Sequence, residues 1–209
     1  MALTDTFSNL SILIRWLHVI AGITWIGMLY FFNFVNVPLQ GALDDAAKKA
    51  VNPNLMPRAL WWFRWGAMIT FLAGVALFTL TYAYTPGQGF GMNQNFKDAM
   101  TGHLTSRAHW ILMGMVFGTI MWFNVWGIIW PAQKKLLSGK AGDQAAALRK
   151  RALFTSRVNT FLSGPMLFGM LSPAHYGASN GVTILTAILI SLATIWLAIK
   201  TSFNVGKSV

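Results

Sequence analysis

Four histidines are the side chains in this chain that are best suited to holding a metal or a redox cofactor. They are His18, His103, His109 and His175, and neutral imidazole is the commonest protein ligand for iron, copper and zinc. The chain has no Cys, and its 5 acidic residues are all Asp. This composition excludes disulfides, thiolate metal sites, cysteine catalysis and a C-x-x-C-H haem attachment motif.

Two of these histidines belong to a repeated pattern. His18 is followed fifteen residues later by Phe-Asn at Asn33, and His109 is followed at the same spacing by Phe-Asn at Asn124. Further along each half, Arg64 matches Arg157, and the segment FLAG at 71–74 matches FLSG at 161–164. All these offsets lie between 90 and 93 residues, which indicates an internal duplication. The alternative is that membrane helices simply share a composition.

The elements that must position these residues are helices in a lipid membrane. The chain is 55% hydrophobic and only 10% charged, which is too few charged residues for a surface that faces only water. Lipid must therefore contact much of the protein. Uncharged runs long enough to cross a bilayer predict five transmembrane helices, at roughly 9–37, 58–84, 104–131, 154–172 and 182–201. We predict one all-α integral membrane domain over residues 1–209. It is a four-helix bundle of two parallel helical-hairpin repeats (about 9–84 and 104–172) plus one extra helix (about 182–201).

The charge distribution predicts the orientation of these helices. The net charge of +11 resembles that of a nucleic-acid-binding protein, but the basic residues lie in loops between apolar runs, so we expect no nucleic acid as a partner. The loops after the first and third helices are rich in Lys and Arg, whereas the loop after the fourth helix has no charge. The positive-inside rule therefore predicts an N-terminus outside and a C-terminus in the cytoplasm. All four histidines then belong to the outer side.

Equivalent positions in two hairpins would bring His18 and His109 to the same depth on facing helices. Two such imidazoles can bind a haem iron from opposite sides, so haem b is the expected cofactor. Gly22, one turn after His18, and Trp25 would make room for the ring or pack against it, and Arg107 would pair with a propionate. The alternative for each histidine is a hydrogen bond to a neighbouring helix.

His175, at the outer end of the fourth helix, is a candidate ligand, a catalytic group or an interfacial residue. His18, His109 and His175 together form the candidate metal set, and copper or another metal is the alternative to haem.

The chain also resembles a known family. Residues 15–35, RWLHVIAGITWIGMLYFFNFV, and residues 156–170, SRVNTFLSGPMLFGM, followed by His175, resemble the urate oxidase N-terminal family. That family is the membrane domain of bacterial urate oxidases that carry a C-terminal cytochrome c. The resemblance implies the bacterial inner membrane, urate oxidation and electron transfer to cytochrome c. The family positions that it carries over are His18, Asn33, His109, Arg157, Asn159 and His175.

These observations predict a haem-binding membrane electron-transfer or oxidase protein. The sequence has no cytochrome c motif, so we expect electrons to pass to a separate c-type cytochrome or to a larger membrane complex. The alternative is a structural or accessory subunit of such a complex that holds no cofactor.

Overall fold

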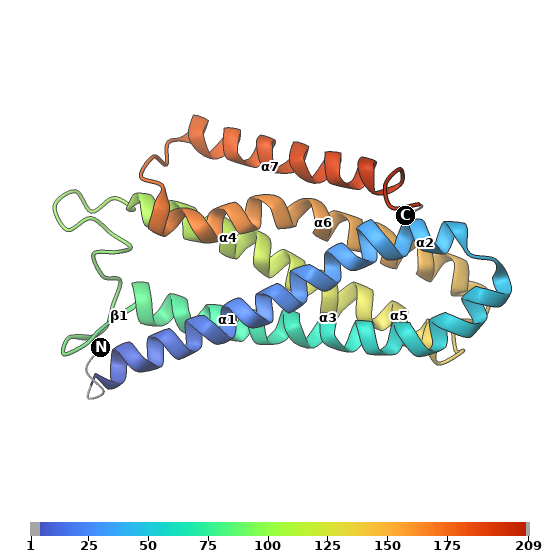
Figure 1. Cartoon of the computed structure of the whole chain (residues 1–209). Coiled ribbons are helices and arrows are strands. Elements are labelled where there is room, and N and C mark those ends of the chain that lie inside the picture. The colour runs from blue at the N-terminus through green and yellow to red at the C-terminus, as the bar shows by residue number, and fades with distance from the viewer. Residues whose placement is uncertain (1–4, 208–209) are drawn as a thin grey trace.

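The structure is a computed structural model that describes residues 5–207, nearly all of them helical (Figure 1). In chain order, the helical elements are α1 (Thr6–Tyr30), the π-helix η1 (Phe31–Asn36), α2 (Val37–Ala42), α3 (Asp45–Tyr82), α4 (Ser106–Phe123), the π-helix η2 (Asn124–Ile129), α5 (Trp130–Leu137), the 3-10 helix η3 (Gly142–Gln144), α6 (Ala145–His175) and α7 (Gly181–Ser202). A hairpin of β1 (Tyr84–Thr85) and β2 (Gly89–Phe90) follows α3. The helices form five long rods, which confirms the predicted all-α fold.

The surface of the rods identifies a multi-pass membrane protein. Within residues 5–207, four rods are long and apolar enough to cross a bilayer, namely Thr6–Ala42, Asp45–Tyr82, Ser106–Leu137 and Gly181–Ser202. Large apolar side chains point outward from them, with Ile23 69% exposed and Leu13 61% exposed. Water does not favour such a surface, whereas lipid does. The fifth rod, α6, carries more polar residues and lies among α1, α4 and α7.

Two helices begin earlier than the apolar runs predict. We expected them to start near 58 and 154, but α3 begins at Asp45 and α6 begins at Ala145. The apolar runs mark the part of a helix that lies in lipid, and both helices continue past it through charged residues. The first turns of α3 tolerate Pro53 and Pro57 inside the helix. These extensions all lie at the end of the bundle that holds the C-terminus (Figure 1).

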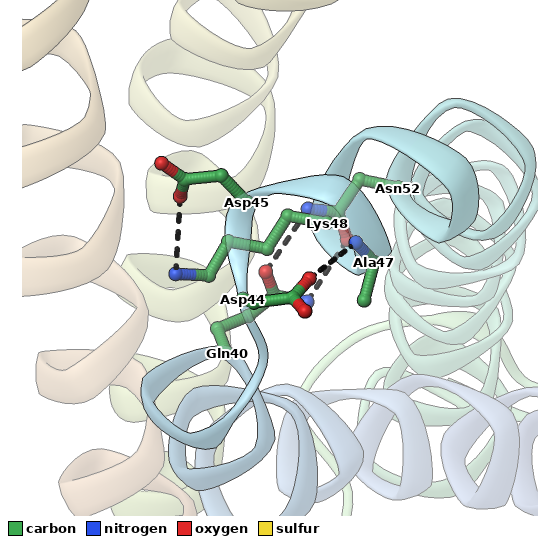
Figure 2. Close-up of polar contacts among 6 residues, drawn as sticks. All are labelled: Gln40, Asp44, Asp45, Ala47, Lys48 and Asn52. Carbon is green, nitrogen blue, oxygen red and sulfur yellow. Dashed lines mark hydrogen bonds and ion pairs between the residues drawn. The ribbon is translucent and has the colours of Figure 1, made fainter.

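The short turn between α2 and α3 is fixed by polar contacts (Figure 2). The side chain of Asp44 accepts a hydrogen bond of 2.7 Å from the backbone N–H of Ala47 and so caps α3. The amides of Gln40 and Asn52 exchange two hydrogen bonds of 2.9 Å, which join the end of α2 to the second turn of α3. The rod of α1 therefore turns back onto α3 within two residues.

The rods form two antiparallel hairpins. The first pairs α1 with α3, the second pairs α4 with α6, and α7 lies on the outside of α6. Smaller contacts join α1 to α6 and α3 to α4, so the two hairpins close a four-helix bundle. The two ends of the chain lie at opposite ends of the bundle, as five crossings require (Figure 1). We call these the N-terminal and C-terminal ends.

Each hairpin contains a π-helical turn in its first rod. In η1 the backbone N–H of Val37 bonds to the carbonyl of Phe32, five residues back, and in η2 the N–H of Trp130 bonds to Val125 in the same way. A proline follows directly in both rods, at Pro38 and Pro131. Proline has no N–H and its ring clashes with the carbonyl four residues back, so widening the preceding turn relieves both problems.

The buried faces of the two hairpins follow one spacing. In the first rods, Ala21 and Gly114 are both buried, as are Phe32 and Val125, and each pair is 93 residues apart. In the second rods the same spacing relates further buried pairs, including Ala59 with Ala152, Ala67 with Thr160, Thr70 with Ser163 and Ala73 with Met166. This regularity supports the predicted repeat, which stays a prediction. It also gives the repeat a definite register.

That register does not match the two histidines to each other. His18 and His109 are 91 residues apart, so the position that matches His18 in the buried pattern is Ile111. Two residues along a helix turn a side chain by about 200°. The two imidazoles therefore point to different sides of their rods.

Candidate functional site at the N-terminal end of the bundle

His18 lies in the interface between α1 and α3. Its Nδ1 is 2.8 Å from the backbone carbonyl oxygen of Thr70. A carbonyl oxygen only accepts, so Nδ1 carries the proton and donates it, and Nε2 keeps its lone pair. Nε2 has no hydrogen-bond partner among residues 5–207. An imidazole held by one nitrogen on a backbone carbonyl, with the other nitrogen free, is the usual arrangement of a metal-binding histidine.

Two glycines make room for this imidazole. A Cβ added at Gly74 would lie 3.0 Å from Cε1 of His18 and 3.3 Å from its Nδ1. Gly74 therefore allows the ring to rest directly on the backbone of α3. On the other side, Gly22 faces Thr70, whose side-chain methyl would lie 3.8 Å from an added Cβ. Gly22 thus keeps α1 close to α3 one turn below His18.

Two arginines reach the same end of the bundle. The side chain of Arg107, from the first turn of α4, lies close enough to interact with the hydroxyl of Tyr82, a buried residue at the end of α3. Arg15 from α1 is close enough to interact electrostatically with this hydroxyl and with His18. Three rods therefore bring their side chains together here.

No acidic side chain neutralises these two arginines. The ion pair found within residues 5–207 joins Lys48 to Asp45 at the C-terminal end. The group of Arg15, His18, Tyr82 and Arg107 therefore carries a net positive charge and suits an anionic ligand.

His109 has different surroundings. It is half-buried, as His18 is. Its Nδ1 is 3.2 Å from the hydroxyl oxygen of Ser179, in the connection between α6 and α7. His18 therefore contacts the other long helix of its own hairpin, whereas His109 contacts a loop that follows the second hairpin.

The first turn of α4 holds that connection in place. Nε1 of Trp110 donates a hydrogen bond of 2.9 Å to the carbonyl of Ala178, and the hydroxyl of Ser106 donates to the carbonyl of Gly177. His109 adds its contact with Ser179 to this set. His109 thus takes part in fastening one loop to one helix. The hydrogen bond to a neighbouring helix, which was the alternative to a ligand role, is the one that His18 makes to Thr70 of α3.

The remaining predicted residues are also dispersed. His175 is the exposed last residue of α6, and His103 is exposed in the loop before α4. No group of three His, Cys, Asp or Glu side chains within residues 5–207 could share one metal ion. Trp25 is buried in the core between α1 and α3, and its Nε1 has no hydrogen-bond partner in the described residues. The structure therefore places His18 and Gly22 against Thr70 of α3, Arg107 near Tyr82, and Trp25 in the core.

A polar network along α6 is the feature that sequence reasoning missed. Asn159 accepts a hydrogen bond of 2.8 Å from Nδ2 of Asn124 and donates one of 3.0 Å to the carbonyl of Met121. Asn33 donates to the hydroxyl of Ser156 at 2.9 Å, so each π-helix contributes one asparagine to α6. The spacing of Ser156, Asn159, Thr160 and Ser163 places them on one helix face. That spacing was visible in the sequence and predicts a buried polar stripe.

The comparison with protein families agrees with this architecture. The sequence matches the family described as "Urate oxidase N-terminal" over residues 4–48, 40–97 and 90–208, nearly the whole chain. The chain belongs to the urate oxidase N-terminal family. Its family resemblance, first carried by residues 15–35 and 156–170, is thereby confirmed. Neither a curated protein nor a solved structure matches it.

The residues present fit in part the haem that the histidine pattern predicts. His18 would fit an iron ligand, because its Nδ1 is anchored and its Nε2 has no partner among the described residues. Arg15 and Arg107 would fit the acidic groups of a haem because they lack carboxylate partners within the described residues. His109 has its Nδ1 on Ser179, so its own contact does not support a role as a second ligand of the same group.

Proposed function

We propose that this membrane protein of the urate oxidase N-terminal family is an electron-transfer or oxidase protein that binds haem b through His18. The observation that carries the proposal is the hydrogen bond from Nδ1 of His18 to the Thr70 carbonyl, which leaves Nε2 without a partner among the described residues, on a ring that interacts with Arg15. His109, which we predicted as the second ligand, is left out of the proposal because its Nδ1 contacts Ser179 in the second hairpin.

The residues of this site would act on the bound group in three ways. Thr70 fixes the tautomer and orientation of the His18 ring, because its carbonyl can only accept. Arg15 and Arg107 would hold acidic groups at the membrane surface. The apolar helices would keep water from the buried side of the haem. The haem itself would supply one-electron chemistry.

The direction of transfer follows from the position of the site. We propose that the N-terminal end faces the outside of the bacterial inner membrane, as the loop charges predict. A c-type cytochrome, or a partner in a larger complex, would exchange electrons there. The family description suggests urate as the reductant, and a urate anion would be attracted to the positive charge at this end.

An absorption experiment tests the proposal. The protein is expressed with ample iron, purified in mild detergent, and a reduced-minus-oxidised spectrum is recorded. We expect a haem b Soret band in the parent protein, its loss in His18→Ala, and its retention in His109→Ala and His103→Ala. Each variant removes one imidazole, so the three are matched controls for one another. Gel filtration verifies that each remains folded.

Three outcomes would overturn the assignment in different ways. A folded parent protein without a Soret band but with bound copper by elemental analysis would make His18 a copper ligand. A parent protein with neither metal, purified in stoichiometric amount with other subunits, would favour the accessory-subunit alternative. A Soret band that survives His18→Ala would place the haem elsewhere.

A further inference from the structure

Arg157 has a buried guanidinium nitrogen that lacks an acceptor. It lies on α6 towards the C-terminal end of the bundle, and its Nη1 is buried without a hydrogen-bond partner among the described residues. The ring of Phe203, directly after α7, is 6.0 Å from its Cζ. A guanidinium nitrogen removed from water is unfavourable unless an anion or another acceptor meets it.

Arg157 lies close to a junction of three elements. Its chain neighbour Ser156 accepts a hydrogen bond from Nδ2 of Asn33 in η1. The elements η1, α6 and α7 contact one another. At this seam of η1, α6 and α7, Nη1 of Arg157 lacks an acceptor among the described residues.

The matching arginine in the first hairpin, Arg64, has a close aromatic partner, so a guanidinium without one is not a general property of the fold. Arg64 lies 93 residues before Arg157, in the register of the buried faces. Its Cζ is 3.7 Å from the centre of the Trp130 ring, a close cation–π contact. The residue that matches Trp130 in the other half is Val37, which has no ring to offer Arg157.

The protein itself provides no carboxylate for this seam. All five Asp residues are exposed, in loops or at helix ends, and none pairs with Arg157 within the described chain. We propose that Arg157, at the seam of η1, α6 and α7, binds an oxyanion, either the phosphate of a phospholipid headgroup or a soluble anion such as phosphate. The planar guanidinium fork suits phosphate oxygens.

Thermal unfolding in dodecyl maltoside tests this site with two probes. One is phosphatidylglycerol, which has a phosphate and hydroxyl groups, and the other is inorganic phosphate, with chloride at equal ionic strength as the reference. At about ten times the dissociation constant, we expect the unfolding midpoint of the parent protein to rise by about 3 °C. Arg64→Gln should show the same rise and Arg157→Gln should show none.

The two probes distinguish the sources of the ligand. A rise with phosphatidylglycerol alone identifies a lipid headgroup site, and a rise with phosphate identifies a site for soluble anions. If Arg157→Gln does not fold, Arg157→Lys keeps the charge but loses the fork, and its rise should be smaller than that of the parent protein. An equal rise in Arg157→Lys would overturn the site in that case. No rise with either probe, or an equal rise in folded Arg157→Gln, would overturn the proposal.

Discussion

The two hairpins share a plan but use their helix interfaces differently. In the first hairpin, the interface of α1 and α3 contains the imidazole of His18, which rests on Gly74. In the second, α4 and α6 approach backbone to backbone, since a Cβ added at Gly169 would lie 2.6 Å from the nitrogen of Gly114. The first interface therefore has room for a ligand-binding side chain, whereas the second is a tight structural contact.

This difference suggests a division of roles within the bundle. The second hairpin, with the polar stripe of α6 and with α7 on its outer side, forms the rigid part. The first hairpin presents His18 and Arg15 at the N-terminal end, and Arg107 reaches them from the start of α4. A duplicated fold can keep one copy of an interface for stability while the other acquires a function.

The largest expected effect on stability comes from replacing the glycines where the helices of each hairpin approach most closely, Gly66 in the first and Gly169 in the second. We expect Gly169→Ala to destabilise the protein by about 3 kcal/mol, because its Cβ would meet backbone atoms that cannot move separately. Gly66→Ala, whose Cβ would lie 3.1 Å from the nitrogen of Trp25, should lose at most about 1 kcal/mol, since alanine also favours the helix. Thermal unfolding in detergent measures both.

Gly118→Ala is the control for that pair. Its Cβ would lie 3.8 Å from side-chain atoms of Met166 and Met170, an ordinary contact, so the better helix propensity should leave stability unchanged or slightly higher. A larger loss from Gly66→Ala than from Gly169→Ala would show that the first hairpin, not the second, has the tighter crossing.

A smaller effect is expected from Gly74→Ala, which separates the cofactor site from general stability. The added Cβ pushes the His18 ring, so we expect a shifted or weakened Soret band with a loss of about 1 kcal/mol. Gly164→Ala, in the matching FLSG segment, would instead clash with the carbonyl of Ser191 at 2.9 Å. It should destabilise the contact between α6 and α7 and leave the Soret band unchanged. Equal spectral changes in both variants would contradict a site confined to the first hairpin.

The long helices were predictable from the sequence because apolar runs indicate which segments lie in lipid. The register in which the two halves of the repeat match could not be predicted in this way. Matching of residue types paired His18 with His109, and FLAG at 71–74 with FLSG at 161–164, at offsets of 91 and 90. The buried positions of the two halves repeat at an offset of 93 residues, which is the offset between Arg64 and Arg157. Since α6 is a continuous helix from Arg157 to Gly164, the match of FLAG with FLSG, at an offset of 90, cannot be in the same register.

The candidate site was predictable only in part for the same reason. The type of a residue identifies what His18 and Arg107 can do, but the side of a helix on which a residue lies depends on its packing partners. The contact of His109 with Ser179 depends on how Gly114 and Trp110 pack against the second hairpin, which no local pattern reveals. The polar stripe of α6 was readable, because its four residues recur at helical spacing.

The smallest expected effect concerns the hydroxyl of Tyr30, which joins the two hairpins. Its oxygen is 2.9 Å from the hydroxyl oxygen of Ser163, which itself donates a hydrogen bond of 2.6 Å to the carbonyl of Thr160. The matching residue in the second hairpin, 93 positions later, is Phe123, which has no hydroxyl and is exposed. Tyr30→Phe therefore makes the two halves alike at this position.

Hydrogen bonds between membrane helices contribute about 0.6 kcal/mol on average, so the unfolding midpoint of Tyr30→Phe should fall by about 2 °C. Phe123→Tyr should leave it unchanged, because an outward hydroxyl gains no partner in the bundle. An unchanged midpoint in Tyr30→Phe would mean that this hydroxyl does not stabilise the link between the hairpins.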